Sequence, residues 1–290
     1  MELYDLTVFM AVVDTGGFTL AAKQLNCVQP NVTARIKKLE TSLGVQLFYR
    51  ENRGVSLTAS GRELIGEAKQ LLHLAANTKA RFSNKHVSGV LNLGVSQTAA
   101  TAWLPGILRE FMKNYPDVEI NVQSLFMASM TAQLLNHELD CALTDIPVEH
   151  PRLRYTFSHP QQLMLVSARD YQISAGTEVT VLNFSKVSQY RRILYDSLHN
   201  QHIRITHELI LKGMDAVLSC IIGGLGVSVL PKSVTSLPHI APYITAQPIQ
   251  GKKGKAGIVC HVNNIETPAL QAFTELTQKT IENHQNGDSR

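Results

Sequence analysis

Apolar residues recur at helical spacing in two short runs near the start of the chain, separated by a break at residues 26–28. Thr19 is expected to cap the first helix, and Pro30 suits the first turn of the second, where its missing N–H would be unpaired anyway. Gly44 is expected to end the second helix. The apolar stripe of that helix has steps of four, three and four residues: Val32, Ile36, Leu39 and Leu43. The pattern predicts two helices joined by a tight turn.

The face opposite this stripe is short, polar and cationic. At 100° per residue it carries Pro30, Thr33, Ala34, Lys37 and Lys38. Small polar side chains can reach base edges in a major groove, and lysines can contact phosphates. A turn with the two charges of Arg50 and Arg53 follows, which predicts a hairpin wing. Spacing alone leaves two interpretations, a DNA-binding helix or a structural bundle with a solvated face.

A long helix with an apolar seam is predicted next. Thr58 is expected to cap it. The seam recurs every three or four residues over nearly three heptads: Leu64, Ala68, Leu71, Ala75, Thr78 and Phe82. Such a seam usually packs against another chain, which predicts dimerisation, and the alternative is packing onto the same domain.

Strands and helices alternate after a polar stretch at residues 83–89. Strands are predicted at residues 90–96, 118–125, 140–144, 162–168, 179–184, 203–207, 226–230 and 256–262. Helices are predicted at residues 101–115, 129–136 and 266–283. This alternation is typical of parallel βαβ units, so the predicted fold class is α/β, with an all-α part at the N-terminal end of the chain.

The charge of the chain is concentrated at its N-terminal end. Residues 1–88 hold 11 Lys and Arg against 7 Asp and Glu, a net +4, and subtraction from the totals of 27 and 23 leaves 16 of each for the remainder. Binding to a polyanion would require this excess of positive charge, and the alternative is that a difference of four charges arose by chance. No secretory signal or membrane span is predicted, and the four cysteines lack a CxxC pair, which indicates reduced thiols in a cytoplasmic protein. A redox-sensing cysteine pair is the alternative.

Reactive constellations are missing from the sequence. It has no nucleophile elbow, phosphate loop or dinucleotide glycine pattern, so neither enzymatic activity nor a cofactor is predicted. His199, His202 and His207 span a predicted helix end and a strand, a spacing that favours a solvated edge over a metal site.

The N-terminal part resembles the signature of LysR-type transcriptional regulators. The matching residues are Leu6, Phe9, Val12, Gly16, Phe18, Ala21, Ala22, Leu25, Gln29, Pro30, Ile36, Leu39, Glu40, Leu43, Gly44, Leu47, Phe48, Arg50, Arg53, Leu57, Thr58 and Gly61. The resemblance implies a winged helix-turn-helix domain at residues 1–58 and a linker and dimerisation helix at residues 59–88. The expected DNA-binding residues are Thr19, Gln29, Pro30, Asn31, Thr33, Ala34, Arg35, Lys37, Lys38, Arg50 and Arg53. The expected dimerisation residues are Leu64, Ala68, Leu71, Ala75 and Phe82.

The remaining part resembles the regulatory domain of the same family. The residues are Leu93, Gly94, Pro105, Phe111, Tyr115, Pro116, Val118, Asp140, Gly224, Gly226, Leu230 and Pro231, whereas residues 171–203 depart from the usual pattern. The resemblance implies an effector-binding domain at residues 89–290 with the two lobes of a periplasmic binding protein. Lobe I is expected at about residues 89–161 and 263–290, and lobe II at about 162–262.

Candidate effector residues follow the expected strands, because ligands of open α/β sheets bind beyond the carboxyl ends of strands. They are Ser96, Gln97, Thr98, Thr101, Phe126, Met127, Ser129 and Arg191. Arg191 could pair with an anionic effector, while helix capping is the alternative role of Ser96 and Thr98, and for Met127 packing in the core is favoured over contact with a ligand. The expected partners are double-stranded promoter DNA, a small-molecule effector, RNA polymerase and further copies of the chain. The sequence therefore predicts a regulator that binds an inverted repeat as a dimer or tetramer, rather than a transport protein or a DNA-tethered enzyme.

Overall fold

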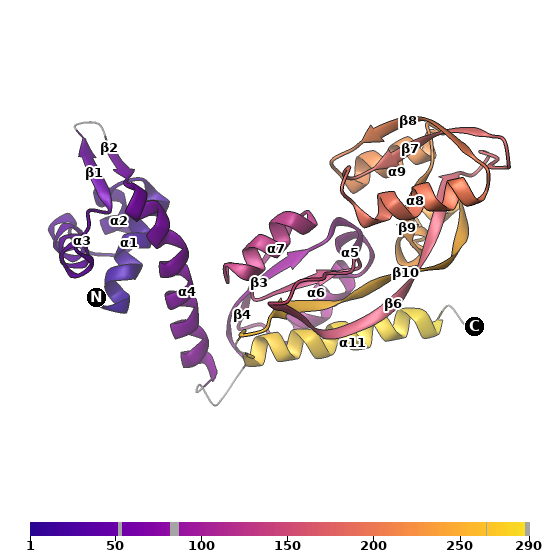
Figure 1. Ribbon diagram of the computed structural model, residues 1–290. Helices are drawn as coiled ribbons and strands as arrows, with labels where there is room; N and C mark the ends of the chain where they lie inside the picture. Colours follow the sequence, from indigo (N-terminus) through magenta and orange to yellow (C-terminus); the bar gives the residue numbers. More distant parts are fainter. Residues whose placement is uncertain (52–53, 82–86, 265, 288–290) are drawn as a thin grey trace. The chain divides into compact units, whose positions relative to one another are not determined.

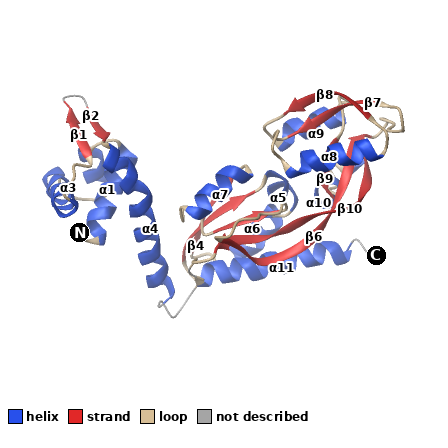
Figure 2. Ribbon diagram, in the orientation of Figure 1, coloured by secondary structure: helices blue, strands red, loops and turns tan. Residues whose placement is uncertain are grey.

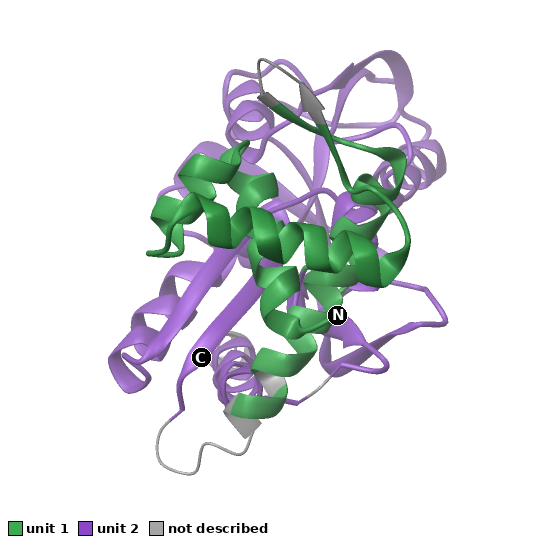
Figure 3. Ribbon diagram, turned by 90° about the vertical axis from the view of Figure 1, so that its left-hand side faces the viewer, with its two compact units in different colours: residues 1–86, 136–138 green, residues 87–135, 139–290 purple. Residues whose placement is uncertain are grey.

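The computed structural model describes residues 1–51, 54–81, 87–264 and 266–287. The chain forms two compact units, one of residues 1–86 with 136–138 and one of residues 87–135 with 139–290 (Figure 3). Each unit has hydrophobic core clusters of its own. The predicted α/β class with an all-α winged N-terminal part is confirmed.

The first unit is a winged helix-turn-helix that continues into a long helix (Figure 1). Its elements are α1 (Leu3–Thr15), α2 (Phe18–Gln24), α3 (Gln29–Leu43), β1 (Phe48–Glu51), β2 (Gly54–Leu57) and α4 (Ala59–Arg81). Gly44 ends α3 with φ 70°, in the left-handed region that favours glycine. Val32, Ile36 and Leu39 are fully buried in the core, as the stripe predicted, whereas Leu43 at the end of α3 is 38% exposed.

Two other local predictions have different outcomes. Thr19 does not cap α2, because the helix begins one residue earlier, at Phe18, with Gly17 at the N-cap position and Thr19 exposed. Thr58 does cap α4, since its Oγ1 accepts a hydrogen bond from the N–H of Gly61 at 2.9 Å. Gly61 is needed there, because a Cβ at this position would lie 2.1 Å from the carbonyl oxygen of Leu47.

The second unit is built on a six-stranded sheet in the order β4-β3-β5-β10-β6-β9 (Figure 2). Its strands are β3 (Gly89–Val95), β4 (Val118–Ser124), β5 (Cys141–Thr144), β6 (Leu153–Ala168), β9 (Ser228–Pro231) and β10 (Ile244–His261). The helices of its first part and its C-terminal end are α5 (Gln97–Ala102), α6 (Leu104–Asn114), α7 (Met127–Leu135) and α11 (Pro268–Gly287). The helix expected at residues 101–115 is therefore two helices, with Trp103 at the break and Pro105 in the first turn of α6.

A second, smaller sheet pairs β7 (Glu178–Asn183) with β8 (Arg204–Ile210) in parallel. The remaining helices of the second unit are α8 (Gln189–Asn200), α9 (Met214–Ile222), α10 (Lys232–Thr235) and the 3₁₀ helix η1 (Ala241–Tyr243). The Val181–Val227 bridge links β7 to the segment that leads into β9. Leu163, Leu194 and Val227 are buried in the apolar cluster under this sheet.

The long strands β6 and β10 correct two predictions. They pair with each other in an antiparallel register from Leu153 to Ala168, so the expected lobe boundary at residues 161 and 162 falls inside one continuous strand. The large sheet is also mixed rather than parallel, because β10 is antiparallel to both of its neighbours, β5 and β6, and β9 is antiparallel to β6, while β3 pairs in parallel with β4 and β5. The order of strands along the chain does not reveal that β10, the last strand, lies between β5 and β6.

In the part of the chain that the structure describes, no single helix is long and apolar enough to cross a membrane. Only when taken together do two consecutive helices, Leu3–Thr15 and Phe18–Gln24, have the length and apolar composition of a membrane span, and they are bent by 116° relative to each other. The apolar residues of these two helices include Leu6, Phe9 and Ala21, which form the core of the first unit.

Candidate DNA-binding surface and effector cleft

The expected recognition face of α3 lies on the surface of the first unit. Six of its residues are exposed, namely Gln29, Pro30, Asn31, Ala34, Lys37 and Lys38, and Thr33 and Arg35 are half-buried. The Nε2 of Gln29 donates a hydrogen bond to the Oγ1 of Thr33 at 2.9 Å. This bond holds an amide and a hydroxyl, the groups that read base edges, next to each other on the helix.

The flank of α3 that faces α1 carries an ion-pair network. Nη1 of Arg35 lies 2.8 Å from Oε2 of Glu2 and 3.0 Å from Oδ1 of Asp5. Nζ of Lys38 donates to the other carboxylate oxygen of Glu2. The hydrogen bonds from Lys38 and Arg35 lower the pKa of Glu2 to about 2, so this carboxylate is charged at neutral pH. Asp5 is fully buried, and the guanidinium of Arg35 lies over the ring of Tyr4, 5.2 Å from its centre.

The wing is only partly within the described residues. β1 and β2 pair in an antiparallel register from Phe48 with Leu57 to Glu51 with Gly54. Arg50 belongs to β1, and Arg53 lies outside the described residues. Thr19 lies on the exposed side of α2.

The apolar seam of α4 is divided between two environments, which corrects part of the dimerisation prediction. Ala68 is fully buried in the core of its own unit, and Leu64 and Leu71 pack partly against that core. Ala68 therefore cannot contact a second chain. Further along α4, Ala75 is half-buried and Leu74 is 49% exposed, while Phe82 lies outside the described residues.

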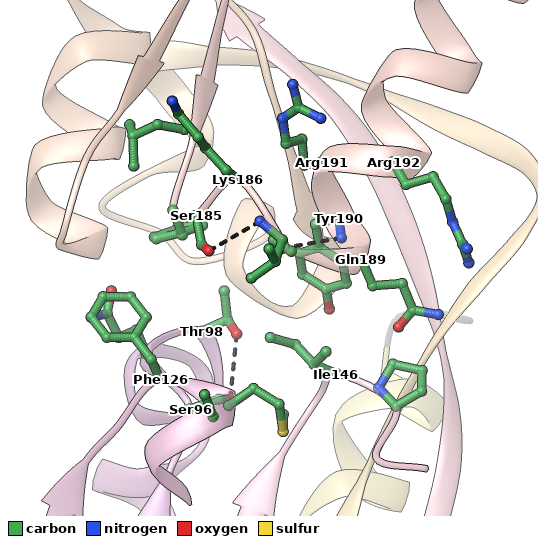
Figure 4. Close-up of a pocket in the computed structure, with 18 of the residues that line it drawn as sticks. Ser96, Thr98, Phe126, Ile146, Ser185, Lys186, Gln189, Tyr190, Arg191 and Arg192 are labelled. Atoms are coloured by element: carbon green, nitrogen blue, oxygen red, sulfur yellow. Dashed lines mark hydrogen bonds between the residues drawn. The ribbon is translucent and has the colours of Figure 1, made fainter. Parts of the chain in front are cut away.

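A cleft of about 880 Å³ opens between the two parts of the second unit. Figure 4 shows its walls, with Ser96, Thr98 and Phe126 on one side and Lys186, Gln189 and Tyr190 on the other. The structure thus brings together Ser96, Gln97, Thr98, Phe126, Met127 and Arg191 of the eight expected effector residues. Thr101 and Ser129 lie outside the cleft lining: Thr101 Oγ1 donates to the carbonyl of Gln97, and Ser129 Oγ accepts from Gln133.

The hydroxyls of Ser96 and Thr98 are already used by a buried carboxylate. They donate to Oδ1 of Asp145 at 2.7 Å and 2.5 Å, so their protons are not free for a ligand. Burial raises the pKa of Asp145, and these two hydrogen bonds hold it down. Oδ2 of the same carboxylate is buried and has no hydrogen-bond partner among the described residues. The hydroxyl of Tyr190 donates to the backbone carbonyl of Asp145 at 3.0 Å, which ties α8 to the end of β5.

Arg191 is likewise occupied. Its Nε and Nη2 donate to the two carboxylate oxygens of Glu208 at 2.6 Å and 2.9 Å, and its guanidinium lies 4.3 Å from the centre of the Tyr195 ring. The hydrogen bond from Arg191 lowers the pKa of Glu208, to which the amide of Asn183 also donates. The pairing corrects the prediction that Arg191 offers a free charge to an anionic effector, because β8 supplies its counter-ion.

Three other cations line the cleft and were not predicted. Lys186, Arg192 and Lys212 are exposed, and none has a carboxylate partner among the described side chains. Ser188, whose hydroxyl accepts from the N–H of Tyr190, caps α8 at the same wall. Asp145 was also missed, although its place directly after β5 is the position where cleft residues are expected.

Metal and thiol chemistry has little support in the described part of the chain. No group of three or more His, Cys, Asp or Glu side chains there could hold a metal ion. The four cysteines are free. Burial raises the pKa of Cys141 well above 9.0 and that of Cys260 to about 12, which keeps both thiols protonated and slow to react.

A winged helix-turn-helix unit followed by a two-part α/β unit with a cleft of ligand size defines a class of protein, the ligand-responsive DNA-binding regulators. Family models support this class. Residues 3–62 match the bacterial regulatory helix-turn-helix protein of the lysR family, and residues 84–281 match the LysR substrate binding domain. The chain belongs to the LysR family of bacterial transcriptional regulators, which are not enzymes. The predicted resemblance is therefore confirmed.

Individual relatives agree over almost the whole chain. The HTH-type transcriptional regulator CzcR of Bacillus cereus is 32% identical over 288 residues, which cover 98% of each chain. A full-length variant of OxyR from Pseudomonas aeruginosa has a TM-score of 0.71 at 20% identity and covers 96% of this chain and 98% of its own. Full-length CbnR complexed with its target DNA has a TM-score of 0.64 at 22% identity, with coverages of 97% and 100%.

Proposed function

We propose that this regulator binds an inverted repeat in promoter DNA as a dimer or tetramer and that a small molecule in its cleft changes this binding. Residues 1–58 form the DNA-binding domain, residues 59–88 the linker and dimerisation segment that contains α4, and residues 89–290 the effector-binding domain. The observation that carries the proposal is the exposed polar face of α3, within a unit whose family model is a DNA-binding one. The protein then acts in the cytoplasm, with RNA polymerase as its partner at the promoter.

The base contacts come from the first two turns of α3. Gln29, Thr33 and Ala34 approach base edges in the major groove, and Lys37 contacts the phosphate backbone. Pro30 and Asn31 lie beside them on the exposed surface of α3. Thr19, Arg35, Lys38 and the wing residues Arg50 and Arg53 complete the proposed contact set.

The second half of α4 provides the pairing surface. Leu74 is 49% exposed there, whereas the first half of the same helix packs on its own unit. Pairing through a helix of this kind brings two recognition helices to neighbouring major-groove faces, about 34 Å apart. Symmetry of the dimer then requires an inverted repeat in the DNA.

The cleft holds the effector. Its volume of about 880 Å³ suits a small metabolite. Lys186, Arg192 and Lys212, which have no carboxylate partner among the described residues, supply positive charge to the cleft, and this favours an effector with an anionic end. Phe126, Met127 and Ile146 cover the apolar part of the effector. Binding changes DNA occupancy only if the effector prefers one arrangement of the lobes.

Selection of binding sites from a random duplex pool tests the DNA part of the proposal. Full-length protein should enrich two inverted half-sites whose centres lie about one helical turn apart. Enrichment of single half-sites, or of direct repeats, would contradict the proposed dimer.

Thermal denaturation of the full-length protein tests the effector part. A panel of matched metabolites, each as a carboxylate and as its neutral amide, should raise the melting temperature only in the carboxylate form. The variant Lys212→Ala should weaken that stabilisation, and Lys232→Ala, which alters a lysine of α10 that does not line the cleft, serves as the control.

A further inference from the structure

Two neighbouring lysines of α3 are in different electrostatic environments. Lys38 donates to the carboxylate of Glu2, which also accepts from Arg35. Lys37 is exposed and has no carboxylate partner among the described residues. The difference follows from the helix, because adjacent residues point 100° apart and only Lys38 faces the start of α1.

Two acids near the start of α1, Glu2 and Asp5, offset two of the three positive charges of α3. Arg35, Lys37 and Lys38 supply three positive charges, Glu2 and Asp5 supply two negative ones at 2.8 Å and 3.0 Å from Arg35, and one positive charge remains. The only acid in α3, Glu40, accepts hydrogen bonds from the N–H groups of Leu47 and Phe48 at the base of the wing.

This charge compensation affects the binding of DNA of any sequence, because it acts on contacts with phosphates. Non-specific binding comes from cations that replace counterions along the phosphates, and each contact contributes about 0.9 to the slope of log K against log salt. A lysine that is already neutralised by a carboxylate displaces fewer counterions, and the carboxylate itself repels the phosphates. Base-edge contacts of Gln29 and Thr33 do not depend on this charge.

We infer that Glu2 is a specificity-determining residue, which masks Lys38 as an intramolecular counter-ion and so lowers the affinity for DNA of any sequence while base-edge contacts are kept. The inference rests on the proposed DNA contact by α3. Asp5 has a separate part: it is buried against Arg35 and also accepts the N–H of Glu2 at 2.9 Å, so Arg35 stays paired when Glu2 is changed. A change at Glu2 therefore releases mainly Lys38.

The experiment measures binding of full-length protein to a duplex of random sequence over a series of salt concentrations. Glu2→Gln should steepen the slope of log K against log salt by about 0.9, which means about eightfold tighter binding near 0.1 M salt for an unchanged 1 M intercept. Adding Lys38→Ala to Glu2→Gln should return the slope to the wild-type value. Asp14→Asn removes an exposed acid from the other end of α1 and should leave the slope unchanged.

The paired lysines give a test that needs no change at Glu2. In the wild-type background, Lys37→Ala should reduce the slope by about 0.9 and Lys38→Ala by much less. A purely structural role of Glu2 would lower the melting temperature without separating the two lysines. Equal slope changes for Lys37→Ala and Lys38→Ala would overturn the inference and leave the proposed function standing, whereas wild-type protein that fails to bind any duplex would overturn both.

Discussion

Replacement of Thr98 by valine tests the buried carboxylate beside the cleft. The hydroxyl of Thr98 lies 2.5 Å from Oδ1 of Asp145, and both residues are buried, with exposures of 4% and 0%. Valine keeps the shape of threonine and removes the donor. A hydrogen bond to a charged group contributes about 1.5–3 kcal/mol, and Ser96 remains as a second donor at 2.7 Å. We expect the free energy of unfolding of the second unit to fall by about 2 kcal/mol at neutral pH.

The dependence of this loss on pH identifies the carboxylate as its cause. Burial raises the pKa of Asp145 above the ordinary value of 3.8, so the folded state holds the proton more tightly than the unfolded chain and stability falls as the pH rises. The hydroxyl of Thr98 lowers this pKa. Its removal raises the pKa further, so the deficit of Thr98→Val should be smallest in acid and grow as the pH rises above 3.8.

Urea unfolding followed by tryptophan fluorescence measures this effect in the relevant unit. Trp103 is the only tryptophan of the chain, is 2% exposed and lies at the junction of α5 and α6. With a slope of about 2 kcal/mol per molar urea, the expected loss lowers the midpoint by about 1 M. Thr101→Val is the control, because that hydroxyl donates to the carbonyl of Gln97 within α5. Equal midpoint shifts for the two variants at every pH would refute the role of Asp145.

Three further variants test the recognition helix, the pairing surface and the ion pair behind the cleft. Gln29→Ala should reduce the binding free energy that discriminates between bases by about 1–3 kcal/mol at one base position of each half-site. An equal loss at all positions in a randomised-site assay would contradict the proposed base contact. Leu74→Glu should reduce the mass measured by light scattering to that of one chain, while the urea midpoint reported by Trp103 stays unchanged. A variant that remains dimeric would show that the chains pair through another surface. Glu208→Gln should lower the free energy of unfolding by about 1 kcal/mol at neutral pH. Because Arg191 lowers the pKa of Glu208 in the folded state, this deficit should vanish as the pH falls from 4.5 through that lowered pKa, and a deficit that does not depend on pH would disprove the role of the pair.

The local pattern of the sequence was sufficient for the buried face and the end of α3. The steps between Val32, Ile36 and Leu39 place these residues on one face of any helix, and Gly44 supplies a positive φ that few other residues adopt. The same periodicity did not distinguish the partners of α4, since Ala68 on its own core and a residue facing another chain have the same spacing.

The contacts within the cleft were decided by tertiary structure. Ser96 and Thr98 follow a strand, as expected of ligand-binding residues. Their hydroxyls donate hydrogen bonds to Asp145, however, which lies 49 and 47 residues further along the chain. Arg191 and Glu208 are 17 residues apart and meet only because α8 packs beside β8.

Sequence by itself thus determined which residues lie on which face of a helix or strand, because that depends on backbone geometry over a few residues. Tertiary structure alone decided which strands pair and which charges meet, as in the insertion of β10 between β5 and β6 and the pairing of Glu2 with Lys38, 36 residues away. Hydrogen bonds and ion pairs act over a few ångströms, and the distance between two side chains in space is set by how whole elements pack rather than by their separation along the chain.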